Sequence, residues 1–351
     1  MINPFRNLFR GQARLPEARA VAPAEAPAPA EAPAAATAPD PFDGPWALLS
    51  GAAEPPPRPL SPGELEQVER LVPRVMEHFG RNHPDPTSFP ALAVRIIDLL
   101  NEPDVDMARL LKAISPDPAI SMNVLRVANS ALYNRGTDVN EMRMAVMRIG
   151  LRGVGEIAAG VAGRSLFDVG LRVEYEIFGQ RWSDLFLDTM AVAFGASQFA
   201  FEQHVGRADR AFLAGMFHDM GKSLALRSLA ALVIAGEVEA PLPDPVVDEI
   251  LERVHVDIGC AVHEIWGLPA HLQDICRRHH DAAVPDGADD MEIHILRMAS
   301  GVHRLVKDPA DPRRLDETRQ SIQAMRLVRR GVSLLHREMQ LHVEKVKVLF
   351  P

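Results

Sequence analysis

The spacing of apolar residues constrains the fold of this chain more than any other feature. From residue 61 onward, apolar side chains recur at intervals of three and four, as in Leu65, Val68, Leu71, Val75 and Phe79. This interval places them on one face of a helix. Breaks rich in Pro, Asn, Asp and Gly separate such segments, and no alternating run is long enough to support a sheet. The spacing therefore predicts an all-α fold.

Composition narrows the class of protein further. The 351 residues are 47% hydrophobic, only 5% are aromatic, and the formal net charge is -9. A negative chain disfavours non-specific binding to nucleic acid. Cys260 and Cys276 are the only cysteines, which fits a reducing, cytoplasmic location, and no apolar run approaches the roughly 20 residues that span a bilayer.

The N-terminal part has a different composition from the rest. Within residues 1–60, the stretch 16–60 is dominated by Ala, Pro and Glu, and it offers little apolar bulk to bury. We therefore predict a disordered Ala/Pro-rich tether, in which Trp46, Leu48 and Leu49 are candidates for docking on the folded part. Order is expected from Ser61, because Ser61 and Glu64 form a capping box around Pro62.

The ordered chain divides into segments of different character. A leading helix and loop are expected over 61–88, short helices over 89–175, and longer helices over 176–307. One long helix is expected over 308–351, with apolar residues at mixed spacings of three and four. That stripe fits either packing on its own domain, which we favour, or a coiled-coil seam that joins two copies into a homodimer.

One short motif points to chemistry. His218 and Asp219 stand side by side in a predicted helix, and Gly221 and Lys222 are expected to break that helix. Imidazole nitrogens and carboxylate oxygens are ligands for divalent metal ions, and two ions bridged by one Asp can clamp a phosphate and activate water. Downstream histidines that could join this pair include His255, His263, His279 and His280. A shared polar pocket and an ordinary structural role for these residues are both open.

Several stretches together resemble a known family. They read FPAL at 89–92, IDLL at 97–100, ISPDPA at 114–119, LRVANSALYN at 125–134, AVMRIGL at 145–151, FLAGMFHDMGK at 212–222, WGLP at 266–269 and RHH at 278–280. In this order they resemble the HD-related output domain, HDOD, a relative of the HD metal-dependent phosphohydrolases. The resemblance implies a two-part helical bundle, with a family-specific part over 89–175 and an HD-like part over 176–307.

The chain departs from the HD enzymes at two positions. Asp188 stands where those enzymes have their first His ligand, and Ser300 stands where they have a late Asp. The Gly-Tyr-Pro signature of the branch that hydrolyses cyclic dinucleotides is absent. The resemblance therefore implies a vestigial metal site of Asp188, His218, Asp219, His255 and His279, with no obligatory cofactor and at most a residual divalent metal ion.

Three functions follow from this reading. The first is a non-catalytic regulatory module in bacterial signal transduction, which acts by binding a protein partner and is gated by a nucleotide or metal in the old site. The second is a metal-dependent phosphohydrolase with variant ligands, in which Lys222 or Arg278 neutralises phosphate. The third is a dimerisation scaffold built on the C-terminal helix.

Overall fold

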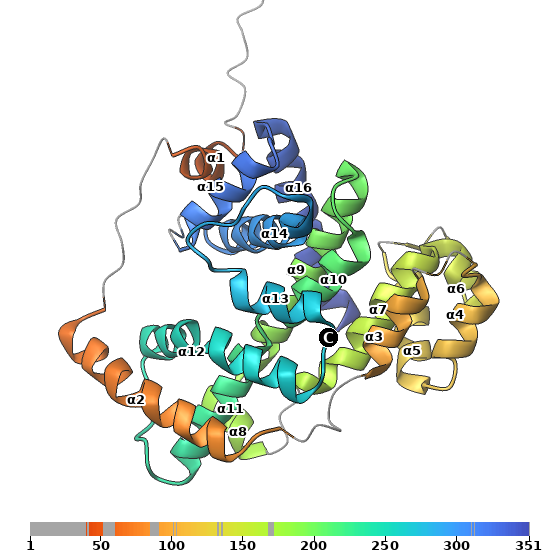
Figure 1. The fold of residues 1–351 in the computed structure, drawn as a ribbon. Coiled ribbons are helices and arrows are strands. Elements are labelled where there is room, and N and C mark those ends of the chain that lie inside the picture. The colour runs from red at the N-terminus through yellow and green to blue at the C-terminus, as the bar shows by residue number, and fades with distance from the viewer. Residues whose placement is uncertain are drawn as a thin grey trace, which may run out of the picture. The chain divides into compact units, whose positions relative to one another are not determined.

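The computed structural model describes residues 40, 42–51, 60–84, 91–100, 102, 104–131, 133–134, 136–167, 172–309, 311 and 313–350, and all their regular structure is helical (Figure 1). The α-helices are α1 (Asp43–Leu49), α2 (Pro62–Arg81), α3 (Ala91–Leu100), α4 (Met107–Ile114), α5 (Pro118–Ala128), α6 (Met142–Ile149), α7 (Leu151–Gly163), α8 (Arg172–Phe178), α9 (Gln180–Gln203), α10 (Ala208–Phe217), α11 (Met220–Ile234), α12 (Asp244–Ile265), α13 (Ala270–Arg278), α14 (Met291–Lys307), α15 (Leu315–Ala324) and α16 (Arg329–Leu349). Two 3-10 turns, Arg164–Leu166 and Ala288–Asp290, complete the set.

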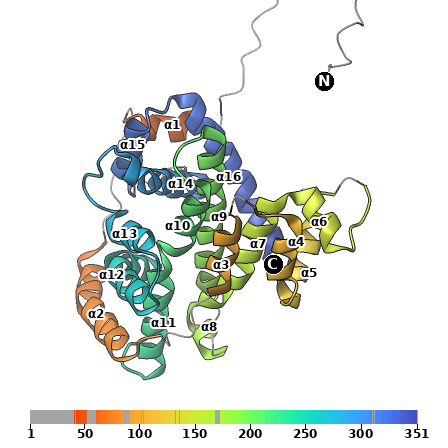
Figure 2. The same ribbon diagram turned by 45° about the vertical axis from the view of Figure 1, so that its right-hand side comes forward.

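The helices over 41–351 fall into two neighbouring groups. Figures 1 and 2 show α3 to α7 gathered on one side, and α9 to α16 stacked beside them. The two groups meet where α3 contacts α10 and where α5 contacts α16, and α2 runs along α11 and α12. The all-α prediction is confirmed for the described residues, whereas the predicted boundary between 175 and 176, which falls within α8, stays a prediction.

Helix α9 is the central element of the larger group. It packs against α10, α14 and α16. Small residues permit this packing, because a Cβ added at Gly215 of α10 would lie only 2.5 Å from the Cα of Ala193 in α9. No helix among the residues that the structure describes is both long enough and apolar enough to cross a bilayer.

The predicted helix start at Ser61 is present, and a second side-chain cap begins α5. The side chain of Ser61 accepts a hydrogen bond from the amide of Glu64, and the Glu64 carboxylate accepts one from the amide of Ser61. Asp117 caps α5 by accepting from the amides of Ala119 and Ile120. These caps satisfy amides that the helix itself leaves without partners.

The predicted N-terminal tether is wrong over residues 43–49, which form helix α1. Leu48 and Leu49 are buried, and Arg319 of α15 donates two hydrogen bonds to the carbonyl of Leu48, at 2.6 and 2.9 Å. Arg329 also pairs with Asp43. The apolar residues therefore dock on the folded part, as the sequence suggested. The rest of the predicted tether, residues 1–39, 41 and 52–59, lies outside the described residues.

The predicted single C-terminal helix is also wrong, because the chain turns between α15 and α16. Arg326 takes a left-handed conformation with φ 53°, and the amide of Leu327 bonds the carbonyl of Ile322 at 2.9 Å, which closes the end of α15. The apolar stripe of α16 is buried against its own chain, through Val332, Leu335, Met339, Val346 and Leu349. Packing within the domain thus accounts for the stripe, and a homodimer through this helix stays a prediction.

Helices α11 and α12 approach closely at one glycine. A Cβ added at Gly221 would lie 1.9 Å from the carbonyl oxygen of His255 and 2.8 Å from the amide nitrogen of Gly259. Both neighbours are backbone atoms of α12, so neither can rotate away. Gly221 therefore sets the distance between the helix that begins after Asp219 and the helix that carries His255.

We expect Gly221→Ala to lower the free energy of unfolding by about 1–3 kcal/mol or more, because α11 and α12 must separate. Gly80→Ala is the matched control, since no atom lies within 4 Å of its added Cβ and the residue is helical. That control should raise stability by roughly 0.5–1 kcal/mol. Urea unfolding measures both, and equal effects of the two variants would contradict this packing.

A buried histidine on α16 makes stability depend on pH. His342 stacks on Phe194 with ring centroids 6.0 Å apart, and both of its ring nitrogens are buried without hydrogen-bond partners in the described part of the chain. Burial, together with the charges of Lys345 and Arg152, lowers its pKa to about 3. An unfolded histidine has a pKa near 6.5, so the unfolded chain binds a proton that the folded chain excludes between these values.

Stability is therefore expected to fall as pH decreases from about 6.5 towards 3, by at most ~1.4 kcal/mol per pH unit for this one group. His342→Gln should remove that part of the slope in unfolding measured from pH 7 to 4.5. Replacement of the exposed His83 by Gln should leave the slope unchanged. An unaltered slope in His342→Gln would show that the ring is protonated in the folded protein.

Candidate metal centre

The His-Asp pair lies between two helices and not within one. Helix α10 ends at Phe217, His218 is its C-cap, and Asp219 precedes α11 as its N-cap. The predicted break at Gly221 and Lys222 is wrong, because both residues lie inside α11. The chain changes direction at His218 and Asp219, between the two helices. This change turns both side chains towards the same polar region.

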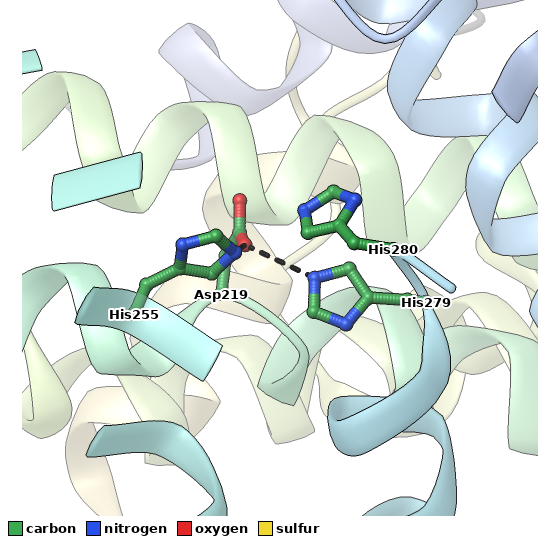
Figure 3. Close-up of side chains that lie close together, drawn as sticks. All are labelled: Asp219, His255, His279 and His280. Carbon is green, nitrogen blue, oxygen red and sulfur yellow. Dashed lines mark ion pairs between the residues drawn. The ribbon is translucent and has the colours of Figure 1, made fainter. Parts of the chain in front are cut away.

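Four residues from three parts of the chain converge beside this junction. One ligand atom each from Asp219, His255, His279 and His280 lies within 4.8 Å of all the others. Figure 3 shows the three imidazole rings around the Asp219 carboxylate. The Nε2 atoms of His255 and His279 lie 3.4 and 3.7 Å from Asp219 Oδ1. We call these four residues the acceptor cluster.

Hydrogen bonds on the far side of each ring fix its tautomer. The Nδ1 of His255 faces the Glu252 carbonyl at 2.9 Å, and that of His279 faces the Cys276 carbonyl at 2.8 Å. The Nδ1 of His280 faces the Glu317 carboxylate at 2.7 Å. Carbonyl and carboxylate oxygens only accept, so the proton belongs on Nδ1 and each Nε2 carries a lone pair.

The inner side of the cluster therefore contains acceptors without donors. Asp219 Oδ1 and the Nε2 atoms of His255, His279 and His280 are buried, and among the described residues none has a partner at ordinary hydrogen-bond geometry. Burial also lowers the pKa of His255 to about 3, so protonation does not supply the missing donor near neutral pH. Three imidazole lone pairs and one carboxylate oxygen fit a first-row divalent metal ion.

The second oxygen of Asp219 has a partner of its own. Lys222 Nζ donates to Asp219 Oδ2 and to Glu252 Oε1, each at 2.8 Å. Burial alone would raise the pKa of Asp219, but His218 and Lys222 outweigh this effect and hold the pKa well below its ordinary value. Glu252 also pairs with Arg314 at 3.1 Å. The carboxylate of Asp219 is thus ionised, with one oxygen facing the cluster and the other facing an ammonium group.

His280 belongs to the cluster, although the sequence analysis did not include it among the metal ligands. Adjacent residues in a helix point about 100° apart, but α13 ends at Arg278, so His279 and His280 are free of that constraint. Their ring centroids lie 4.0 Å apart. The pair of adjacent histidines directly after a helix was the available signal.

Two residues beyond the expected ligand set hold the histidine pair in place. Glu317 of α15 accepts from His280, and the buried Arg297 of α14 donates to the carbonyls of His279, Arg278 and Asp281 at 2.6, 3.3 and 2.5 Å. These contacts order the turn after α13. No pattern in the sequence connects residues so far apart along the chain, so neither was predicted.

Asp188 lies outside the acceptor cluster. Its Oδ1 faces His303 Nε2 at 3.0 Å, and Lys307 Nζ lies 2.9 and 2.7 Å from its two oxygens. Burial would raise the pKa of Asp188, but His303 and Lys307 lower it overall. Asp188 is thus an ionised carboxylate engaged by two side chains of α14.

The other predicted positions lie beside the cluster. His218 is buried, with Nδ1 on the carbonyl of Gly215 at 2.9 Å and Nε2 3.4 Å from Asp219 Oδ2. Ser300 lines a cavity together with His218, His279 and His280, at the wall where a late Asp was expected. His263 has a structural contact instead, because its Nε2 bonds the carbonyl of Phe217 at 3.2 Å.

Two cavities border the acceptor cluster. The cavity shared by Ser300 and the histidines measures about 10 Å³, which is room for about one water-sized species. A larger cavity of about 720 Å³ is lined by His218, Asp219 and Lys222, and by Asp188 and Arg304 farther along its wall. Its volume is typical of sites for small organic ligands.

Comparisons with known proteins agree with this architecture. An uncharacterised protein of Treponema pallidum is 27% identical over 207 residues, which are 56% of this chain and 38% of that relative. The chain thus matches well under half the length of that curated relative.

Solved structures show the same fold. One from Shewanella amazonensis, provisionally named a metal-dependent phosphohydrolase, is 21% identical with a TM-score of 0.56, and the match covers 79% of this chain and 99% of that one. One from Marinobacter aquaeolei, provisionally named a signal transduction protein, is 19% identical with a TM-score of 0.52, over 81% of this chain and 64% of that one.

The family model of the HDOD domain matches residues 87–282, which are more than half of the chain and include every member of the acceptor cluster. The match also includes the helices α3 to α13 that frame the site. By this match and by its fold, the chain belongs to the HDOD domain family.

Proposed function

We propose that this protein is a regulatory HDOD module that binds one divalent metal ion at Asp219, His255, His279 and His280 and does not hydrolyse phosphate esters. The observation that carries the proposal is the group of four buried acceptor atoms that converge without a donor. Buried polar atoms are costly unless they are paired, and a cation pairs all four at once. A bound ion would supply positive charge and cross-link three segments of the chain.

The surroundings of Asp219 favour one ion over two. A carboxylate that bridges two ions through its two oxygens would need Oδ2 for the second ion, whereas Lys222 Nζ lies 2.8 Å from Oδ2. An ammonium group at that distance repels a second cation. The places of the two missing ligands are taken by Asp188, which is held by His303 and Lys307, and by Ser300, a poor ligand. Two-metal activation of water therefore lacks support here.

The charge of the larger cavity alone does not favour a phosphate ligand. Its walls contain more acidic than basic side chains, including Asp184, Asp244, Asp248 and Asp311 beside Lys222 and Arg304. A phosphate group would meet net repulsion unless a cation neutralised it. A nucleotide gate would therefore depend on the bound metal ion.

A role in signalling through a protein partner rests on the family. Membership of the HDOD family implies a regulatory module. One structural neighbour is provisionally named a signal transduction protein. A single structural ion suits this role, because metal binding stabilises the folded domain that a partner recognises.

We expect the purified protein to retain close to one equivalent of manganese, iron or nickel after incubation and desalting, as measured by mass spectrometry of the metal. His255→Ala and His280→Ala should each lose it, because each removes one of four ligands. Asp188→Asn should retain it, since Asp188 lies outside the cluster. No metal in the wild type, or loss in Asp188→Asn alone, would contradict the proposed site.

The same metal-loaded protein should show no hydrolysis of p-nitrophenyl phosphate or of cyclic dinucleotides above the rate without protein. Turnover that depends on metal and disappears in His218→Ala would establish the phosphohydrolase function instead.

Glu317→Ala should weaken metal binding by about 10- to 100-fold, because Glu317 orients His280 from outside the ligand shell. Glu344, an exposed acid on α16 that pairs with Lys347, provides the control, and Glu344→Ala should not alter affinity. Calorimetric titration with nickel compares the two. An unchanged affinity in Glu317→Ala would remove Glu317 from the site.

A further inference from the structure

The two cysteines of the chain lie next to each other in the fold. Cys260 is in α12 and Cys276 is in α13, these two helices pack against each other, and the two thiols interact. The sulfur of Cys276 packs on α12, since a Cβ added at Gly259 would lie 2.8 Å from it. Both thiols are free. The only two cysteines in 351 residues thus lie on two helices that pack together.

The two thiols differ in the way that a reactive pair requires. Cys260 is half-buried and reachable by a small oxidant, whereas Cys276 is fully buried. The neighbouring Cys276 side chain, and to a lesser degree the charge of Arg277, lower the pKa of Cys260 to about 7. An accessible thiolate is the form of cysteine that reacts with peroxides.

The cysteine pair is directly connected to the acceptor cluster. The carbonyl of Cys276 accepts the Nδ1 proton of His279 at 2.8 Å, and its thiol donates to the carbonyl of His218 at 3.7 Å. Helix α12 also carries His255. Any displacement of Cys276 towards Cys260 therefore acts on the residue that orients His279.

We propose that Cys260 and Cys276 form a peroxide-sensitive pair, which closes into a disulfide between α12 and α13 and thereby weakens metal binding at the acceptor cluster. The predicted effect of the disulfide on metal binding rests on the proposed function. The Cys260 thiolate attacks hydrogen peroxide, gives a sulfenic acid and releases the first water. The Cys276 sulfur then attacks the Cys260 sulfur, the S–S bond forms, and the sulfenic oxygen leaves as a second water. Two thiols lose two electrons, and one peroxide gains them.

Two readouts test this on the full chain. Reduced protein is treated with hydrogen peroxide, the peroxide is removed, and the intact mass is measured. We expect a loss of the mass of two hydrogen atoms in the monomer, reversed by dithiothreitol. Nickel titration of the same samples should show affinity at least about tenfold lower after oxidation, as expected when a partner of a ligand histidine moves.

Cys260→Ser is the control, because it removes the accessible thiol and leaves every member of the cluster in place. Peroxide should change neither its mass by two hydrogens nor its affinity for nickel. A stable oxygen-bearing Cys260 or a disulfide-linked dimer in the wild type would contradict the proposed disulfide between Cys260 and Cys276. Equal affinity of the reduced and oxidised wild type would overturn its link to the metal.

The two proposals fail in different ways. Reduced protein that binds no nickel would contradict the proposed function together with the metal part of this inference. The intact mass tests the disulfide separately, because disulfide formation in this experiment requires no metal.

Discussion

The Asp219 carboxylate is the group on which the candidate site depends. It is ionised and almost enclosed by protein, and an unpaired charge in such a place would be strongly destabilising. Lys222 compensates one oxygen, and Lys222 is in turn held by Glu252. The other oxygen faces three imidazole nitrogens that, in their neutral form, offer only lone pairs. A cation in the cluster would complete the pairing that the described residues leave open.

The position of Lys222 also explains how this site differs from a binuclear hydrolase. The same carboxylate that would bridge two ions is shared between a cluster and an ammonium group. Asp188 and Ser300, at the expected places of two further ligands, do not compensate for this. In the proposed function, one ion would tie α11, α12 and the turn after α13 together as a structural element. Its binding would then respond to metal supply and to thiol oxidation.

Much of the fold follows from local signals. Apolar spacing predicts helices α2 to α7, and the side chains of Ser61, Asp106 and Asp117 cap the starts of α2, α4 and α5 by accepting from backbone amides. The errors have tertiary causes. Residues 43–49 become helical by docking on α15, and the chain turns at Arg326 so that α16 can return along α9 and α14.

The residues of the site were also predictable only in part, because some carry a sequence pattern and others are positioned by the fold alone. His218, Asp219, His255 and His279 carry a sequence pattern, and the fold brings the last three together. His280 was available as a neighbour of His279, but its role depends on where α13 ends. Glu317 lies beyond the residues that the family model matches, and only the folded chain places it against His280.

The number of metal ions is the quantity that separates a regulatory module from a hydrolase. Anomalous diffraction from crystals grown with manganese would count them directly. We predict one peak, among the side chains of Asp219, His255, His279 and His280, with Lys222 still bonded to the far oxygen of Asp219. Two peaks bridged by Asp219, with Lys222 displaced and Asp188 as a ligand, would contradict the account.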